Sequence, residues 1–355
     1  MAEDTASKAE KIIVNTKSGK YPVIIGKTLN FGELTRDVKD ACKVVIVSDD
    51  VVFPLYGDAV MKGFSKSGYR VNACIIRNGE TSKTLSTIEK ILEFVAKEEL
   101  TRTDILVALG GGVVGDITGF AAAIYLRGID FIQIPTTVLA AVDSSVGGKT
   151  GVDLNSGKNI VGAFHQPKAV FCDPNFFESL TEAVYADGMA EVIKHAMIKD
   201  RDMMFALDDL SAAEMCKRNI KIKASVVELD EFDTGIRKIL NFGHTVGHAV
   251  EVLSDYKISH GSAVSIGMTV ISRASENLGL TEEPVLTELT EILKKHKLPV
   301  QCDYSSKNLA DAALRDKKRS GEKITLVIPK KIGSAELYDL PVEKLESFIS
   351  KGLEK

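Results

Sequence analysis

The sequence predicts an α/β + α fold, in which a Rossmann-like, doubly wound domain is followed by a mainly α-helical domain. In the first half, short β-branched runs alternate with helical stretches. The run at 105–109 is continuously apolar, which is typical of a strand buried on both faces of a parallel sheet. After about residue 174, amphipathic helices follow one another. We expect domains of residues 1–174 (1–10 a disordered tail) and 175–355, with the active site in the cleft between them.

Each expected element follows from local periodicity. Strands are predicted where β-branched and apolar residues cluster, and helices where apolar residues recur at spacings of three and four. The expected strands are 11–14, 21–25, 43–48, 70–76, 104–109, 130–135, 169–172, 323–329 and 335–340. The expected helices are 50–67, 83–98, 114–126, 186–198, 202–210, 212–229, 236–253, 261–278, 282–296 and 342–351.

Composition narrows the classes of function. The 355 residues are 45% apolar and 26% charged, which suits a soluble two-domain protein. The net charge of -4 argues against nucleic-acid binding, and no apolar run approaches the roughly 20 residues that span a bilayer. The polar N-terminus is unlike a signal peptide, and the five scattered cysteines favour buried free thiols. We expect a cytoplasmic protein that binds neither nucleic acid nor membrane.

Residues 142–162 form the most informative segment. It combines the carboxylate of Asp143, the cations Lys149 and Lys158, the amide of Asn159 and several glycines, with little core-forming periodicity. Glycines let a backbone approach a ligand closely, and lysines supply point charges for phosphate or carboxylate groups. The segment predicts a site for an anionic small molecule.

Gly110, Gly111 and Gly112 follow a predicted strand and open a predicted helix. The N–H groups and dipole of such a helix start favour a pyrophosphate, and Asp49 at the end of an earlier strand could accept bonds from a ribose. The spacing is not G-x-G-x-x-G, so a tight turn with solvated aspartates is an equally good interpretation. The polar turn that contains Glu80 is interpreted as a capped helix start. One of the two threonines at 136–137 is expected to cap a helix as well.

Three of the six histidines lie within seventeen residues. His244 and His248 are four residues apart and share a helical face, as zinc-binding pairs do, and His260 opens the next helix. Glu191, on another predicted helix, could add an oxygen ligand. Two histidines and a carboxylate leave an open coordination position, which is typical of a catalytic metal. Hydrogen-bonded core histidines are the alternative, and spacing alone does not choose between His248 and His260.

Cations lie close to these histidines in the sequence. Arg237, Asn241, His244 and His248 follow steps of four, three and four residues, so we expect all of them on one helical face. Such a face would be costly to bury without a ligand. The charge run 315–319, which contains Lys317, is interpreted as solvated.

At this point whole motifs resemble the 3-dehydroquinate synthase family of the sugar phosphate cyclases. The matching stretches are, in order, VDSSVGGKTGVDLNSGKNIVGAFHQP, GMAEVIKHAMI, NFGHTVGHAVE and HGSAVSIGM. The likeness runs from about residue 11 to the C-terminus. It implies conversion of 3-deoxy-D-arabino-heptulosonate 7-phosphate to 3-dehydroquinate and phosphate in the shikimate pathway. It also implies catalytic NAD, a divalent metal (zinc or cobalt), a homodimer, and a sequence of transient oxidation, phosphate elimination, reduction, ring opening and intramolecular aldol reaction.

The resemblance also implies residue roles. The metal ligands would be Glu191, His244 and His260, with His248 turned to the substrate. The phosphate would be held by Lys149, Asn159, Asn241, His248 and Lys317, with Arg127 from a dimer partner. Lys223 and Arg237 would take the carboxylate, and Asp143, Lys158 and Lys194 the reacting hydroxyls. NAD would contact Asp49, Glu80, Lys83, Gly111, Gly112, Val113, Asp116, Thr136 and Thr137, together with Lys149 and Lys158.

Two places depart from the family pattern. Ser262 stands where the family usually has glutamate, and residues 180–184 differ from L-P-x-R-E. The alternatives are another sugar phosphate cyclase such as 2-deoxy-scyllo-inosose synthase, a metal-dependent polyol dehydrogenase, and an inactive homologue retained for binding. The intact Gly-Gly-Lys-Thr motif and Arg237 argue against the first, and the many phosphate-binding lysines against the second. The complete set of expected ligands argues against the third.

Overall fold

The computed structural model describes residues 9–28, 43–317 and 322–354, and for 315–317 it describes the backbone. The chain divides into two compact units. The first contains Met1–Leu180 and Ala212–Phe232, and the second Thr181–Ser211 and Asp233–Lys355. This division differs from the single boundary expected near 174, because the segment 212–232 belongs to the first unit. Most of the expected N-terminal tail, residues 1–8, lies outside the described residues.

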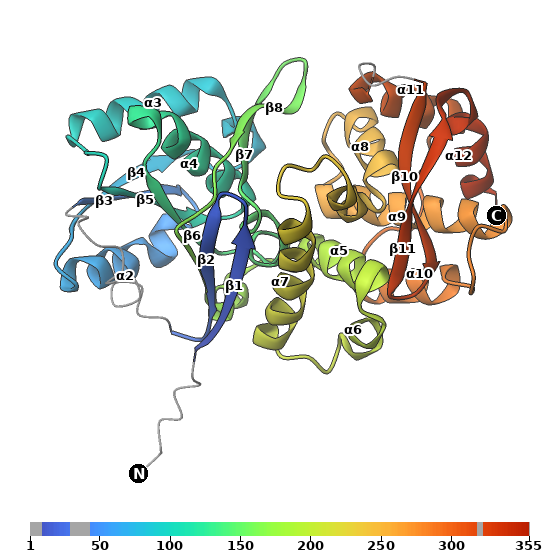
Figure 1. Ribbon diagram of the computed structural model, residues 1–355, viewed down its shortest axis with the longest axis horizontal. Coiled ribbons are helices and arrows are strands. Elements are labelled where there is room, and N and C mark those ends of the chain that lie inside the picture. Colours follow the sequence, from blue (N-terminus) through green and yellow to red (C-terminus); the bar gives the residue numbers. More distant parts are fainter. Residues whose placement is uncertain (1–8, 29–42, 318–321, 355) are drawn as a thin grey trace, which may run out of the picture. The chain divides into compact units, whose positions relative to one another are not determined.

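The first unit is built on a sheet of strand order β4-β3-β5-β6-β9-β2-β1 (Figure 1). Neighbouring strands from β4 to β2 pair in parallel, and β1 and β2 form an antiparallel hairpin at one edge. β5 is buried along its whole length, as its continuous apolar run predicts. The bounds are β1 Glu10–Thr16, β2 Gly19–Ile25, β3 Lys43–Asp49, β4 Arg70–Ile76, β5 Ile105–Gly110, β6 Asp130–Pro135 and β9 Ala169–Cys172.

The strand order places a topological switch beside β3. β4 lies on one side of β3 and β5 on the other, so the chain leaves the carboxyl ends of β3 and β5 in opposite directions. Asp49 ends β3, and Gly110 ends β5. In open α/β sheets, ligands bind outside the strands at such a switch. The predicted doubly wound fold is therefore confirmed, and it places Asp49 and Gly110 at the carboxyl ends of two neighbouring strands.

The helices of the first unit include α2 (Phe53–Lys66), α3 (Leu85–Lys97), α4 (Gly112–Ile124) and α7 (Ala212–Leu229). α4 packs closely on its neighbours through glycine: a Cβ on Gly119 would come within 2.4 Å of the Thr150 side chain. Contacts with β1 connect α7 to the sheet. These contacts, and not its position in the sequence, assign α7 to the first unit.

A hairpin, β7 (Lys149–Leu154) and β8 (Gly157–Phe164), lies in the segment for which we predicted an anion site but no strands (Figure 1). Its glycines serve strand packing: a Cβ on Gly162 would meet the Thr150 carbonyl at 2.1 Å. The pairing register also shifts between Val152 and Leu154. Because small residues replace the usual apolar alternation, the sequence pattern did not predict these strands.

The second unit is mainly helical, and α9 lies at its core. α9 contacts α5, α8, α10 and α12 and is buried along most of its length (Figure 1). Its helices are α5 Glu182–Lys199, α6 Arg201–Ala206, α8 His244–Leu253, α9 His260–Asn277, α10 Leu286–Lys295, α11 Ser306–Lys317 and α12 Leu345–Leu353. β10 (Lys323–Lys331) and β11 (Ser334–Pro341) form an antiparallel hairpin. Within the described segments, no helix has the length and apolar character needed to cross a membrane.

Short helical turns connect these elements. They are η1 Glu80–Ser82, η2 Tyr125–Arg127, η3 Ala140–Ser144, η4 Pro174–Ser179, η5 Ile236–Asn241 and η6 Val342–Lys344. α11 covers part of the charge run that we interpreted as solvated. No helix was predicted over Ser306–Lys317, although Leu309, Ala310 and Ala313 on it are buried.

The helix expected over 236–253 is broken, and this corrects one prediction. The chain forms η5, passes through Gly243 at φ 80°, and starts α8 at His244. Gly243 packs against α9, where a Cβ would lie 2.8 Å from the Val264 carbonyl oxygen. Arg237 and Asn241 therefore do not share a continuous helical face with His244 and His248. Four-residue steps imply a common face only when the helix is unbroken.

Gly261→Ala is expected to destabilise the protein by about 3 kcal/mol, because there is no room for a methyl group between α9 and α5. A Cβ at this position would lie 2.0 Å from the backbone oxygen of Asp187. Urea unfolding measures the loss. The control, Ser262→Ala, removes a hydroxyl that bonds Ser259 at 2.9 Å and should lose only about 1 kcal/mol. Equal stability of the two variants would contradict the close packing.

Candidate functional site

Glu191 is a fully buried carboxylate in the middle of α5. Thr181 caps this helix by accepting the Val184 N–H at 3.4 Å, so the divergent segment 180–184 still starts the helix correctly. Lys194, one turn after Glu191 and also buried, forms an ion pair with its carboxylate. A buried carboxylate must be paired or bound to a metal, and this one has a cation beside it.

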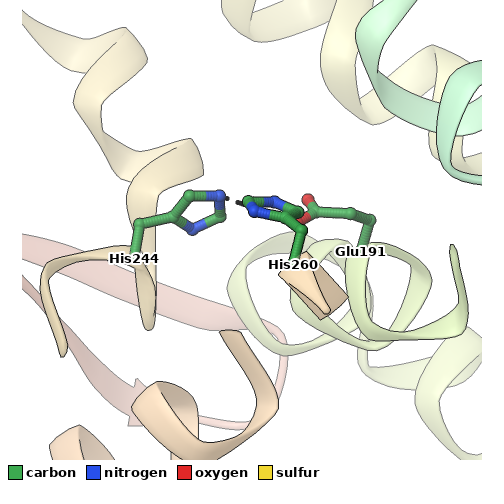
Figure 2. Close-up of side chains that lie close together, drawn as sticks. All are labelled: Glu191, His244 and His260. Atoms are coloured by element: carbon green, nitrogen blue, oxygen red, sulfur yellow. Dashed lines mark ion pairs between the residues drawn. The ribbon is translucent and has the colours of Figure 1, made fainter. Parts of the chain in front are cut away.

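Two histidines face Glu191 from two other helices. His244 is the first residue of α8 and His260 the first of α9, and their Nε2 atoms lie 3.6 and 3.3 Å from Glu191 Oε1. Figure 2 shows the three side chains pointing toward one another from separate elements. Helix starts place these rings here: Asp187 of α5 accepts the Gly261 N–H at 2.7 Å and so fixes the beginning of α9.

The two histidines titrate in opposite directions. Burial lowers the pKa of His244 to about 3, against the opposing effect of the Glu191 charge. Burial would also lower the pKa of His260, but hydrogen bonds to Glu191 and Glu251 outweigh it and raise that pKa to about 10. Without a metal, His244 is therefore neutral at pH 7 and His260 carries a proton.

The donor set suits a divalent metal. One nitrogen from each histidine and one oxygen of Glu191 lie within 4.8 Å of one another. Two imidazoles and one carboxylate are the ligands of a catalytic zinc site that keeps a position open. His248 is about half exposed and does not belong to this group, but it forms a second possible ligand group with Glu251 and His260.

A second cluster, in the first unit, surrounds Lys83. Its buried ammonium donates to Asp116 Oδ2 at 2.7 Å and to Asn159 Oδ1 at 2.6 Å. Burial would lower the pKa of Lys83, but the charges of Asp116 and Glu80 outweigh it and the pKa is raised. The Asn159 N–H is bonded to Asp153 Oδ1 at 2.7 Å. Lys83 thus connects a residue expected at NAD with one expected at the substrate phosphate.

Lys83→Met is expected to lower the free energy of unfolding by about 3 kcal/mol, because it leaves Asp116 without its cation in a buried setting. The expected loss of unfolding free energy is at the low end for buried ion pairs, because the Asp116 side chain is 19% exposed. The double variant with Asp116→Leu should recover most of the loss, because neither charge remains. Urea unfolding of both variants checks this, and an equal loss in the double variant would contradict it.

Four further predicted site residues form two ion pairs in the first unit, although these pairings themselves were not predicted. Lys223 forms an ion pair with Asp143, and Lys158 Nζ lies 3.4 Å from Glu80 Oε1. The ion pair with Lys158 gives Glu80 a contact that the unaided interpretation as a capped turn did not foresee. The pairing of Lys223 links α7 to the η3 turn.

The residues at the switch point form local turns. Asp49 Oδ1 accepts the N–H groups of Val51 and Val52 at 2.9 and 2.8 Å. Gly111 is the N-cap of α4, and Gly112, Val113 and Asp116 lie in its first turns. Thr137 accepts the Ala140 N–H at 3.2 Å, which confirms the expected capping role for one of the two threonines. Thr136 is buried beside it, with its N–H bonded to Gly110.

The remaining predicted residues are more dispersed. Arg237 is 2% exposed, whereas Asn241 and Lys149 are exposed. Arg127 is exposed with a left-handed φ of 69°, a conformation that in a non-glycine residue is often kept for function. The Lys317 side chain lies outside the described residues.

Sequence reasoning missed two carboxylates at this site. Asp187 fixes the start of α9, and Glu251 lies 3.5 Å from His260 Nδ1. Glu251 carried a signal: it is a charged residue inside the apolar run 249–253, three residues after His248. A buried charge in such a run needs a partner.

Comparison with known proteins decides the family. The family model for the N-terminal part of 3-dehydroquinate synthase matches residues 73–187, and the one for its C-terminal part matches residues 188–319. The chain belongs to the 3-dehydroquinate synthase family. A 3-dehydroquinate synthase from Clostridium beijerinckii is 44% identical over an alignment of 348 residues, and the match covers 94% of this chain and 99% of the relative. The resemblance recognised in the sequence motifs is confirmed.

Solved structures support the same fold. A 2-deoxy-scyllo-inosose synthase complexed with carbaglucose-6-phosphate, NAD+ and Co2+ is 25% identical with a TM-score of 0.85, covering 97% of this chain and 100% of that one. A 2-epi-5-epi-valiolone synthase from Streptomyces hygroscopicus, with NAD+ and Zn2+ bound, is 25% identical with a TM-score of 0.84, covering 94% and 96%. The 3-dehydroquinate synthase family thus shares its architecture with other sugar phosphate cyclases.

Proposed function

We propose that this chain catalyses the 3-dehydroquinate synthase reaction, in which 3-deoxy-D-arabino-heptulosonate 7-phosphate is converted to 3-dehydroquinate and phosphate. The observation that carries the proposal is the group of Glu191, His244 and His260, built around a fully buried carboxylate, in a chain of this family. A purely structural role would not explain why three titratable side chains converge here. The same three side chains provide the ligands of a catalytic metal.

NAD and a divalent metal, zinc or cobalt, are the proposed cofactors. Glu191, His244 and His260 would hold the metal. The residues for NAD are those at the switch point and around Lys83, namely Asp49, Glu80, Lys83, Gly111, Gly112, Val113, Asp116, Thr136 and Thr137, with Lys149 and Lys158. When bound, the metal makes a substrate hydroxyl more acidic, and NAD accepts and returns a hydride.

The chain's own residues bind and orient the substrate. Lys223 and Arg237 bind the carboxylate, and Asp143 keeps Lys223 in place through the observed ion pair. Lys149, Asn159, Asn241, His248 and Lys317 bind the phosphate. Asp143, Lys158 and Lys194 face the reacting hydroxyls. Fixing both ends of the substrate restrains its conformation, and orientation of this kind lowers barriers by roughly 7–11 kcal/mol in the best cases.

The proposal includes a homodimer in the cytoplasm. Arg127 of one protomer would contribute to the phosphate site of its partner. Its exposure and its left-handed backbone, next to Leu126 at φ 49°, suit a side chain held outward for a contact.

Phosphate release from 3-deoxy-D-arabino-heptulosonate 7-phosphate with catalytic NAD tests the function. We expect release that stops with a metal chelator, without lasting absorbance at 340 nm, because NADH is reoxidised in each turnover. Accumulating NADH without phosphate would indicate a dehydrogenase instead. No turnover by protein loaded with metal and NAD would exclude this substrate.

Another sugar phosphate cyclase activity is the second candidate, because the structural neighbours include a 2-deoxy-scyllo-inosose synthase. The cations Lys223 and Arg237 favour a carboxylated substrate, and the full-length relative at 44% identity is a 3-dehydroquinate synthase. Assaying glucose 6-phosphate in parallel distinguishes the two activities.

Zinc affinity is expected to rise about tenfold per pH unit between about pH 6.5 and 8.5. His260 keeps its proton up to about pH 10 in the metal-free protein, and a metal must displace that proton. His244 is already neutral and adds no dependence. Competition with a chelator at several pH values, corrected for the chelator's own protonation, measures the slope. A pH-independent affinity would contradict a protonated His260.

A further inference from the structure

Glu251 is a buried carboxylate of α8 that has no role among the ligands and substrate contacts above. We propose that Glu251 is a positioning residue, which holds His260 so that the Nε2 atom of His260 is free of hydrogen and directed at the metal. The inference rests on the metal centre of the proposed function. It concerns the orientation of a ligand and not the identity of the substrate.

The His260 ring lies between two carboxylates from different helices. Its Nε2 is 3.3 Å from Glu191 Oε1 of α5, and its Nδ1 is 3.5 Å from Glu251 Oε2 of α8. The proton of a neutral imidazole resides on the nitrogen that has the better acceptor. Once a metal beside Glu191 takes the Nε2 lone pair, the remaining proton of the ring lies on Nδ1, where Glu251 is placed to accept it.

The second histidine of the centre has the same arrangement with a different acceptor. His244 Nδ1 lies 3.1 Å from the backbone oxygen of Phe242, and its Nε2 faces Glu191 at 3.6 Å. Metal-binding histidines usually donate their outer N–H to a carboxylate or a carbonyl. Here the outer nitrogen of His260 faces a carboxylate and that of His244 faces a carbonyl. Both Nε2 atoms point toward Glu191, which indicates a single centre.

Hydrogen bonds and a tight turn hold the backbone around Glu251. Its carbonyl oxygen accepts the Tyr256 N–H at 2.8 Å and the Ser254 hydroxyl at 2.9 Å. Asp255 and Tyr256 both have left-handed φ values, 51° and 57°, which reverse the chain toward His260. The turn returns His260 to the helix that bears Glu251.

Glu251 could instead be a direct ligand in a second metal centre. His248, Glu251 and His260 also have ligand atoms within 4.8 Å of one another and could hold a metal themselves. His260 can bind a metal through Nε2 together with Glu191, or through Nδ1 together with Glu251 and His248. Glu191 is fully buried and has two Nε2 atoms directed at it, whereas the His248 side chain is 47% exposed and its Nε2 is 4.0 Å from Glu251. The geometry therefore favours Glu191 as ligand and Glu251 as outer partner.

The test measures metal binding without substrate, on the full-length metal-free protein. Glu251→Gln should weaken zinc binding about 10- to 100-fold, the usual effect of losing such a partner, and should change the visible absorption spectrum of bound Co2+. Glu251→Asp, which keeps the carboxylate, should give an intermediate affinity. An unchanged zinc Kd in Glu251→Gln would overturn the proposal. If that variant does not fold, Glu251→Asp is compared with the wild type, and an unchanged Kd there would overturn it equally.

His248→Ala is the matched control, because it removes a ligand of the alternative centre only. We expect its zinc Kd and Co2+ spectrum to match the wild type, although its activity falls. A loss of zinc affinity as large as that of Glu251→Gln would make Glu251 a direct ligand and overturn the positioning role. Because every readout uses the metal alone, failure of the proposed reaction in the wild type would leave this result interpretable.

Discussion

His260→Ala is expected to abolish zinc binding and to reduce phosphate release by roughly a thousandfold or more. The variant removes one of the three proposed ligands and the ring that lies between Glu191 and Glu251. A metal contributes several kcal/mol to the stabilisation of developing charge, and about 4 kcal/mol corresponds to a thousandfold in rate. Metal content by elemental analysis and the phosphate assay measure the two losses.

The fold of this variant should survive, because the His260 side chain is 31% exposed and forms no part of the apolar core. Circular dichroism checks this. His296→Ala is the matched control: its ring belongs to the same unit but faces Asp208 at 3.9 Å, and its removal should preserve both zinc and activity. Full activity of His260→Ala under metal-free conditions would refute the metal centre.

Arg237→Ala is expected to lower kcat/KM for the carboxylated substrate by roughly 30- to 1000-fold, mostly through KM. Arg237 is 2% exposed, and a buried guanidinium that binds a carboxylate with two hydrogen bonds contributes about 2–4 kcal/mol. Steady-state kinetics of the purified variant measure the change. Zinc content should stay at the wild-type level, because Arg237 is not one of the proposed metal ligands.

Lys238→Ala provides the neighbouring control, since it removes a half-buried cation from the same η5 turn. We expect it to leave KM nearly unchanged. An unchanged KM in Arg237→Ala would argue against carboxylate binding by this residue. It would also reopen the case for a cyclase whose substrate has no carboxylate.

Much of the first unit could be predicted because its elements have strong local patterns. The strand predicted at 104–109 is observed at Ile105–Gly110, since the continuous apolar run 105–109 fits a buried parallel strand. The β7–β8 hairpin could not be predicted, because its glycines are there to let two backbones approach. Residues chosen for close approach look like a loop when only their propensities are considered.

The second unit shows a different limit. Helical spacing placed Arg237 and His248 on one face, and Gly243 separates them. A single glycine in a helical pattern is compatible with a continuous helix. The helix is broken at Gly243 because α8 packs closely on α9 there. Likewise, spacing alone could not choose between His248 and His260 as ligand.

By itself, the sequence determined the fold class, the chemistry of the candidate ligands and, through its motifs, the family. Tertiary structure alone decided which nitrogen of His260 faces Glu191 and that Glu251 stands on its other side. The physical reason is that periodicity describes one element at a time, whereas a metal site requires side chains from several elements to converge. Glu191, His244 and His260 lie on three helices, and only the packing of α5, α8 and α9 brings their ligand atoms within reach of one ion.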